Sequence, residues 1–186
     1  MHLLFAVILL PAITSCSQAE QPVTSTNVPA AFYDRQMAQQ AGLRPVTDKY
    51  AVSPQIQIKD IKAIADAGFT RIINHRPDNE QKGQPLSADI AAEAQRLGLT
   101  FVNLPFSPGN LTREIFDALS AELARSDEPT LAYCRSGTRA ITIWALSEVR
   151  AGNQTPEQVI AAASAAGYNL QGQKEALEKL QTSDAD

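Results

Sequence analysis

The stretch from Leu131 to Ala140 reads LAYCRSGTRA, an apolar strand followed by a short polar loop and the start of a helix. Cys134 stands first in this loop and Arg139 closes it, so we expect the thiol to face backbone N–H groups and the positive end of a helix dipole. Such surroundings favour the thiolate and also bind anions. The alternative is an inert cysteine buried after a core strand, but two arginines and a glycine beside it would make burial costly. The stretch therefore predicts a nucleophilic cysteine in an anion-binding loop.

Strand and helix patterns alternate on both sides of this loop. We expect strands at 50–52, 69–74, 100–104 and 129–133, and helices at 31–41, 58–67, 87–97, 112–124, 140–149, 155–167 and 171–180. The helices are expected to start at Ser or Thr caps and to stop near glycine. This alternation predicts a single α/β domain at 46–182, with a largely parallel central sheet flanked by helices. Sites in such sheets lie at the carboxyl ends of the strands, where Cys134 and the segment 75–80 both fall.

The first 16 residues contain no Lys, Arg, Asp or Glu and include an apolar run from Leu3 to Leu10. That run is too short to span a bilayer but suits a secretory signal. Residues 13–16 resemble the bacterial lipobox, whose cysteine is lipidated and becomes the new N-terminus. We therefore expect residues 1–16 to be a lipoprotein signal peptide and 17–45 to be a flexible tether with a short helix. The protein would be exported to the periplasmic side and anchored to a bacterial membrane by lipid on Cys16. Plain secretion and a cytoplasmic protein with an apolar N-terminus are the alternatives.

Composition limits the partners. The 186-residue chain has 16 Lys and Arg against 20 Asp and Glu, a net charge of −4, and no block of basic residues. This argues against nucleic acid and leaves the attraction for an anion to local groups. No cluster of His, Cys, Asp or Glu has metal-ligand spacing, so we expect no metal and no cofactor. If Cys16 carries lipid, Cys134 is the one thiol of the mature chain. The expected partner is a small anionic substrate, a phosphate ester or a sulfur donor.

Two segments resemble a known family. The first reads GFTRIINHRPDNE from Gly68 to Glu80, and the second reads CRSGTRA from Cys134 to Ala140. Together they resemble the phosphatase-like domain of bacterial beta-lactamase-hydrolase-like proteins, which is related in fold to dual-specificity and tyrosine phosphatases. The resemblance covers about residues 50–170 and implies a tyrosine-phosphatase-like fold.

The resemblance also implies roles for the loop residues. Cys134 would be the nucleophile that takes a phosphoryl group and then loses it to water. Arg139 and the loop N–H groups would bind the oxyanion, with Gly137 allowing the tight turn. The other members of the expected anion-binding set are Arg135, Ser136 and Thr138. Arg135 is either a second anion ligand or a solvated side chain.

Four ionisable residues follow the strand at 69–74, and three of them, Arg76, Asp78 and Glu80, are expected to support the site. The two carboxylates could supply a proton, brace Arg139 through a bidentate pair, or stand as ordinary loop charges. Bracing is favoured, because a fixed guanidinium needs a counter-ion. The fourth residue, His75, is expected to be a hydrogen-bonding group of the loop rather than a catalyst.

Three features depart from the phosphatase pattern. The loop has four residues between Cys134 and Arg139 where phosphatases have five, Tyr133 stands in place of the usual His, and the segment 106–110 lacks the expected Asp acid. The shorter spacing is similar to the active loop of rhodanese-type sulfurtransferases, which need no proton donor because sulfite leaves as an anion. We favour a cysteine-dependent phosphatase-like hydrolase. The alternatives are a rhodanese-type sulfurtransferase carrying a persulfide on Cys134, and a non-catalytic module that binds an anion or a phospho-ligand.

Overall fold

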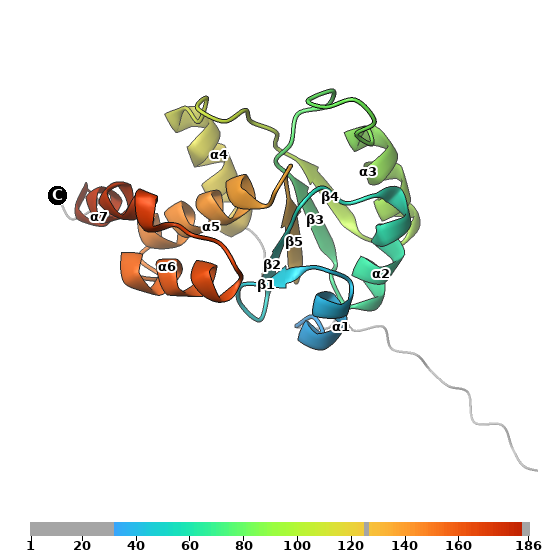
Figure 1. Cartoon of the computed structure of the whole chain (residues 1–186), viewed down its shortest axis with the longest axis horizontal. Helices are drawn as coiled ribbons and strands as arrows, with labels where there is room; N and C mark the ends of the chain where they lie inside the picture. Colours follow the sequence, from blue (N-terminus) through green and yellow to red (C-terminus); the bar gives the residue numbers. More distant parts are fainter. Residues whose placement is uncertain (1–31, 125–126, 184–186) are drawn as a thin grey trace, which may run out of the picture.

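The computed structural model describes residues 32–124 and 127–183 of the chain (Figure 1). The predicted signal peptide, Cys16 and the start of the tether lie outside the described residues, so export and lipid anchoring stay predictions. Across the two described ranges, no helix combines the length and the apolar character that a membrane crossing requires.

A five-stranded sheet with the order β1-β2-β5-β3-β4 forms the centre of the domain. The parallel strands are β2 (Tyr50–Ser53), β5 (Thr130–Tyr133), β3 (Arg71–Asn74) and β4 (Thr100–Asn103). The edge strand β1 (Arg44–Pro45) pairs antiparallel with β2; it was not predicted, because two residues carry no periodic pattern. The expected α/β fold with a largely parallel sheet is confirmed. Since β5 occupies the middle of the sheet, the loop that follows it opens at the centre of the carboxyl edge.

Helices cover both faces of the sheet (Figure 1). One face carries α1 (Arg35–Gln40), α2 (Ile61–Asp66) and α3 (Ser87–Arg96), and the other carries α4 (Arg113–Ala124), α5 (Thr138–Arg150), α6 (Pro156–Ala165) and α7 (Lys174–Ser183). Short 3-10 turns, η1 (Ile58–Asp60) and η2 (Gln171–Gln173), precede α2 and α7. The single helix expected at 58–67 is therefore divided, because the Asp60 carboxylate accepts a hydrogen bond from the Gln57 N–H and closes a separate first turn. Thr155 caps α6, and a capping box with Gln158 closes its first turn.

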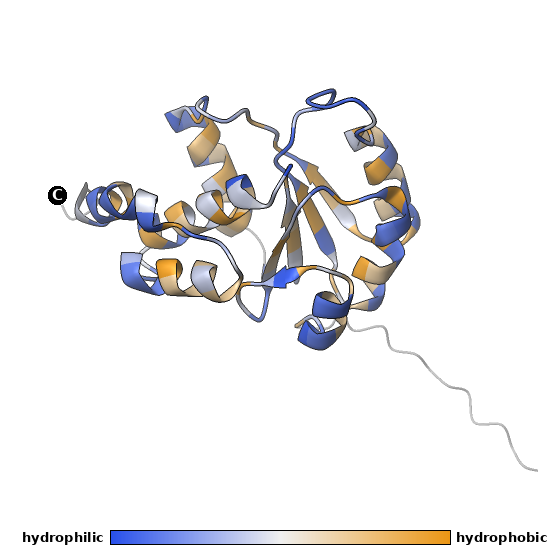
Figure 2. Cartoon of the chain, viewed as in Figure 1, coloured by the Kyte–Doolittle hydropathy of each residue, from blue (hydrophilic) through white to orange (hydrophobic). Residues whose placement is uncertain are grey.

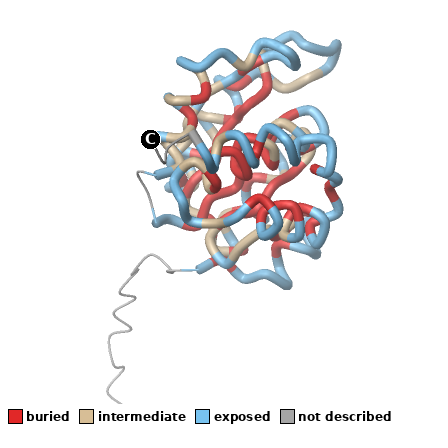
Figure 3. Tube along the Cα trace, turned by 90° about the vertical axis from the view of Figure 1, so that its left-hand side faces the viewer, coloured by how far each residue is buried: buried red, intermediate tan, exposed pale blue. Residues whose placement is uncertain are grey.

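Two apolar cores lie on the two sides of the sheet. Figure 2 colours the ribbon by hydropathy, and Figure 3 shows buried segments running through the middle of the trace. Within β5, Leu131 and Tyr133 join the core beneath α1 to α3, while Ala132 joins the core beneath α4 to α7. Trp144 of α5 is buried in the second core and stacks on Tyr50 of β2, with 6.0 Å between ring centroids. A strand buried on both faces holds the following loop rigidly in place.

Candidate active site

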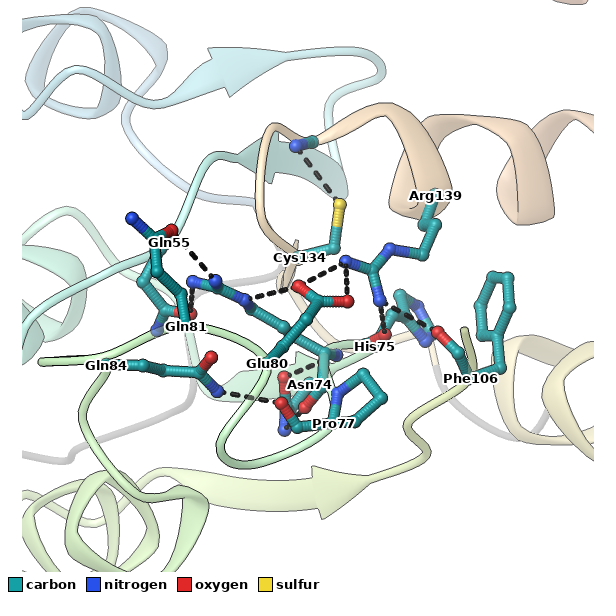
Figure 4. Close-up of polar contacts among 12 residues, drawn as sticks. Gln55, Asn74, His75, Pro77, Glu80, Gln81, Gln84, Phe106, Cys134 and Arg139 are labelled. Carbon is teal, nitrogen blue, oxygen red and sulfur yellow. Dashed lines mark hydrogen bonds and ion pairs between the residues drawn. The ribbon is translucent and has the colours of Figure 1, made fainter. Parts of the chain in front are cut away.

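The loop between β5 and α5 holds the thiol at the N-terminus of a helix. Cys134 follows β5 directly, and Gly137 is the N-cap of α5 with φ 89°. The Gly137 N–H donates a hydrogen bond to the Cys134 Sγ at 3.1 Å (Figure 4). The backbone donor and the positive end of the α5 dipole both stabilise negative charge on the sulfur.

Cys134 is nevertheless buried, with 1% of its surface exposed. Our expectation that the neighbouring arginines would keep it from being buried is wrong. The Arg139 guanidinium lies against partners that satisfy its charge, and the Arg135 side chain is exposed, so neither brings an uncompensated charge into the interior. The sulfur is buried against a polar backbone donor, which distinguishes it from the inert cysteine of an apolar core.

Arg139 is fixed by three groups from two neighbouring loops (Figure 4). Its Nη1 donates to the backbone carbonyls of His75 at 3.2 Å and Phe106 at 2.8 Å. Its Nη2 donates to both Glu80 carboxylate oxygens, at 2.8 and 2.9 Å. The expected bracing of Arg139 by a carboxylate is therefore present, and Glu80 provides it. A guanidinium held in this way is oriented before any anion arrives.

Glu80 is shared between two arginines. The buried Arg76 donates from Nε to Glu80 Oε2 at 2.7 Å and from Nη1 to Gln55 Oε1 at 2.8 Å. Burial acts to raise the pKa of Glu80, but the hydrogen bonds from Arg139 and Arg76 outweigh it and hold this pKa below the usual value. A carboxylate in this state remains ionised, so Glu80 is unsuited to the role of the missing proton donor. Two guanidinium groups and one carboxylate leave this side of the loop with one net positive charge.

Asp78 is not a brace for Arg139, and this part of the prediction is wrong. Its carboxylate accepts hydrogen bonds from the Ser87 N–H at 2.8 Å and from the Ser87 hydroxyl at 2.7 Å, at the start of α3. Ser87 was expected to cap this helix but is its first residue, and Asp78 accepts its N–H instead. Asn79, which lies between the two carboxylates, has φ 60° and turns the chain there. As a result, Glu80 meets Arg139 while Asp78 meets α3.

His75 has the hydrogen-bonding role that was expected. Its Nδ1 lies 3.2 Å from the Leu104 carbonyl, which requires the proton on this nitrogen. Burial lowers the pKa of His75 to about 4; the hydrogen bond to Leu104 opposes the shift and the nearby charge of Arg139 adds to it. Its Nε2 is buried and meets no polar partner in the described part of the chain. The neutral ring ties the loops after β3 and β4 together behind Arg139.

The remaining loop residues lie at the surface. Ser136 and Thr138 are exposed, with 3.1 Å between their hydroxyl oxygens, and Arg135 forms no ion pair within residues 32–124 and 127–183. In the same ranges, no acceptor meets the N–H groups of Arg135, Ser136 or Thr138. Unpaired amides at the start of a helix are the usual ligands of a bound anion.

Gly137 has no room for a side chain. A Cβ built there would lie 1.8 Å from the Tyr168 hydroxyl, and the backbone is left-handed.

We expect Gly137→Ala to destabilise the fold by about 1–3 kcal/mol and to lower activity at least tenfold, because the N–H that meets the sulfur would move. The matched control is Gly152→Ala, which has φ 69° but open space around its Cβ. Equal activity in the two variants would contradict the role of Gly137; thermal unfolding and turnover rates measure the two effects.

Two contributors to the site were missed at the sequence level. Gln55 follows β2, accepts from Arg76, and donates its backbone N–H to the Arg135 carbonyl at 3.3 Å. Its position after a parallel strand was the available signal, since that strand ends at the same edge as β5. Tyr168 follows α6 and donates its hydroxyl proton to the Ser136 carbonyl at 3.2 Å. Nothing in the sequence indicated a contact across 32 positions.

Comparisons with known proteins place this domain in a family. Residues 42–152 match the family described as the beta-lactamase hydrolase-like protein, phosphatase-like domain. A beta-lactamase hydrolase-like protein from Xylella fastidiosa is 33% identical over 125 residues, which make up 67% of this chain and 29% of that protein. The match therefore spans less than a third of the curated relative.

Solved structures show the same fold. A protein from Neisseria meningitidis Z2491, whose assignment as a phosphatase is provisional, superposes with a TM-score of 0.66 at 30% identity, covering 74% of this chain and 96% of its own. The P. aeruginosa protein TpbA, solved in complex with phosphotyrosine, superposes with a TM-score of 0.57 at 9% identity, over 79% of this chain and 92% of its own. The second likeness concerns the fold alone. The domain is thus tyrosine-phosphatase-like in architecture.

Proposed function

The chain belongs to the family of phosphatase-like domains of beta-lactamase hydrolase-like proteins, and on this basis we propose that it is a cysteine-dependent phosphatase that acts through a Cys134 thiolate. The observation that carries the proposal is the hydrogen bond from the Gly137 N–H to the Cys134 Sγ, at the N-terminus of α5. Arg139, held by Glu80, would be the ligand for the anion. Membership of the family supports the reaction class, and the loop supports the residues that carry it out.

The reaction would proceed in two displacements. The Cys134 thiolate attacks phosphorus, an S–P bond forms, the P–O bond to the leaving group breaks, and the leaving group departs with the electron pair. Water then attacks the cysteinyl-phosphate, which releases inorganic phosphate and restores the thiolate. Arg139 and the free N–H groups of the loop would stabilise the equatorial oxygens in both transition states.

Among the described residues, neither the loop after β4 nor Glu80 supplies a proton donor, and this bears on the substrate class. The segment 104–112, which follows β4, contains no carboxylate, and Glu80 is held ionised by its two arginines. Leaving groups that are stable as anions, such as phenolates, need little protonation, whereas alkoxides need a proton. We therefore propose aryl phosphates or other activated phosphates as substrates.

A second candidate, rhodanese-type sulfur transfer, is favoured by one observation: only four residues separate Cys134 from Arg139. In this reaction the thiolate attacks the outer sulfur of thiosulfate, an S–S bond forms, and sulfite leaves without requiring a proton. A cyanide acceptor then attacks the persulfide sulfur to give thiocyanate and returns the electron pair to Cys134. The same loop could serve either reaction, so a direct comparison of substrates is needed.

The deciding experiment offers the purified protein an aryl phosphate, an alkyl phosphate and thiosulfate with cyanide in parallel. We expect release of phosphate from the aryl ester, much slower release from the alkyl ester, and no thiocyanate above that of Cys134→Ser. Formation of thiocyanate without release of phosphate would reject the phosphatase and establish the transferase. A third outcome would identify an anion-binding module. In that outcome the protein neither releases phosphate nor forms thiocyanate, Cys134 is alkylated slowly, and phosphate protects it from alkylation.

A further inference from the structure

Tyr168 approaches the catalytic loop from a part of the chain outside the matched family segment of 42–152. It stands between α6 and η2, and α6 and α7 both pack on α5. Its hydroxyl donates to the Ser136 carbonyl at 3.2 Å and fills the space beside the Gly137 Cα. The Ser136 carbonyl and the Gly137 N–H belong to the same peptide group, and that N–H donates to the Cys134 sulfur. Tyr168 therefore contacts the peptide that binds the thiol.

The phenol is itself held in place by Arg44 of β1. The Arg44 guanidinium carbon lies 4.7 Å from the centroid of the Tyr168 ring, and its Nη1 donates to the Gly167 carbonyl at 3.3 Å. Partial burial raises the pKa of Tyr168. The positive charge of Arg44 opposes this increase, and a negative charge on Cys134 adds to it. The hydroxyl therefore stays protonated at neutral pH and acts as a donor. A rigid donor at this point restricts rotation of the Ser136–Gly137 peptide.

We propose that Tyr168 is a positioning residue, which orients the Ser136–Gly137 peptide so that its N–H binds the Cys134 thiolate. The C-terminal helices α6 and α7, beyond the matched family segment, thereby become part of the active site. The proposal rests on the proposed role of Cys134 as the nucleophile. It concerns the state of the thiol, so it can be tested whether the substrate is a phosphate ester or a sulfur donor.

The ionisable groups on the elements around the loop would all remain in a variant that removes only the Tyr168 hydroxyl. On the loop and the start of α5 these are Arg135 and Arg139; from the other elements they are Tyr50, His75, Arg76 and Glu80. A change in the ionisation of Cys134 in such a variant would therefore come from the reoriented peptide. If Tyr168 had a purely structural role, the pH dependence of Cys134 reactivity would not change in this variant. That pH dependence therefore tests the proposed role specifically.

The experiment compares Tyr168→Phe with Tyr33→Phe in the full chain. Tyr33 is a buried tyrosine whose hydroxyl also donates to a backbone carbonyl, that of Thr47, away from the loop. Alkylation by iodoacetamide is followed as a function of pH on the peptide that contains Cys134, so that Cys16 does not contribute. In Tyr168→Phe we expect the pH of half-maximal alkylation to rise by about 0.5–1 unit, because a hydrogen bond to a charged group is weakened. In Tyr33→Phe it should stay unchanged.

Turnover on the substrate identified above gives a second readout. We expect Tyr168→Phe to lower kcat about tenfold with KM nearly unchanged, and Arg44→Gln to produce a weaker form of both effects. If Tyr168→Phe matches Tyr33→Phe in alkylation and in kcat, the proposal is overturned. Failure of the phosphatase assay alone would remove the proposed function but leave the alkylation result, and with it the role of Tyr168, standing.

Discussion

Cys134→Ser will abolish turnover, with a loss of about a thousandfold or more, while the domain stays folded. Serine is nearly isosteric, and its hydroxyl can accept the Gly137 N–H in place of the sulfur at 3.1 Å. It would remain protonated, however, because the buried His75 donates its Nδ1 proton to the Leu104 carbonyl and burial lowers its pKa to about 4, so it is a poor base. Steady-state rates with an aryl phosphate measure the loss, and thermal unfolding measures the fold.

Binding provides the control for this variant. Because the loop amides and Arg139 are unchanged, Cys134→Ser should still bind inorganic phosphate in a calorimetric titration. Turnover retained in the serine variant would exclude Cys134 as the nucleophile. Turnover and phosphate binding lost together, with an altered unfolding temperature, would show that the sulfur instead maintains the loop.

Arg139→Lys will lower kcat/KM by about 100- to 1,000-fold, whereas Arg135→Lys will lower it only a few-fold. Arg139 uses Nη1 on two carbonyls and Nη2 on Glu80, so its orientation is fixed on three sides. A lysine has one nitrogen and cannot satisfy these acceptors while it also meets an anion. Arg135 is exposed and forms no ion pair with any described residue. It therefore contributes mainly its positive charge, which a lysine also carries.

The pair of variants is compared on one substrate at constant ionic strength, since exposed charges are screened by salt. A loss at Arg135→Lys equal to or greater than that at Arg139→Lys would mean that the oxyanion is bound from the other side of the loop. Phosphate protection of Cys134 against alkylation, measured in both variants, separates weaker binding from slower chemistry.

The location of the site could be predicted from the sequence because it depends on local patterns. The alternation of apolar strands and glycine-terminated helices determines a parallel sheet, and a parallel sheet brings Cys134 and the segment 75–80 to one edge. This inference uses only neighbours in the chain and the topology that follows from them. The family resemblance implied a tight turn at Gly137, and the structure has φ 89° there.

The partners of the side chains could not be predicted in the same way. Asp78 and Glu80 are equivalent carboxylates by sequence, and only the left-handed turn at Asn79 separates one that meets Ser87 from one that meets Arg139. The burial of Cys134 was also missed, because it depends on how fully Glu80 and two carbonyls satisfy Arg139. Tyr168 reaches Ser136 through the packing of α6 and α7 on α5, and that packing leaves no periodic signal near either residue.

The most direct test of the central claim is to trap the covalent intermediate on the sulfur. The protein is mixed with excess aryl phosphate, quenched in acid within milliseconds, and digested, and the peptide containing Cys134 is analysed by mass spectrometry. The account predicts a phosphoryl group on Cys134 in the wild type, formed in a burst with the released phenolate, and no such adduct in Cys134→Ser. A burst of phenolate with an unmodified Cys134, or phosphate transferred to any other residue, would contradict it.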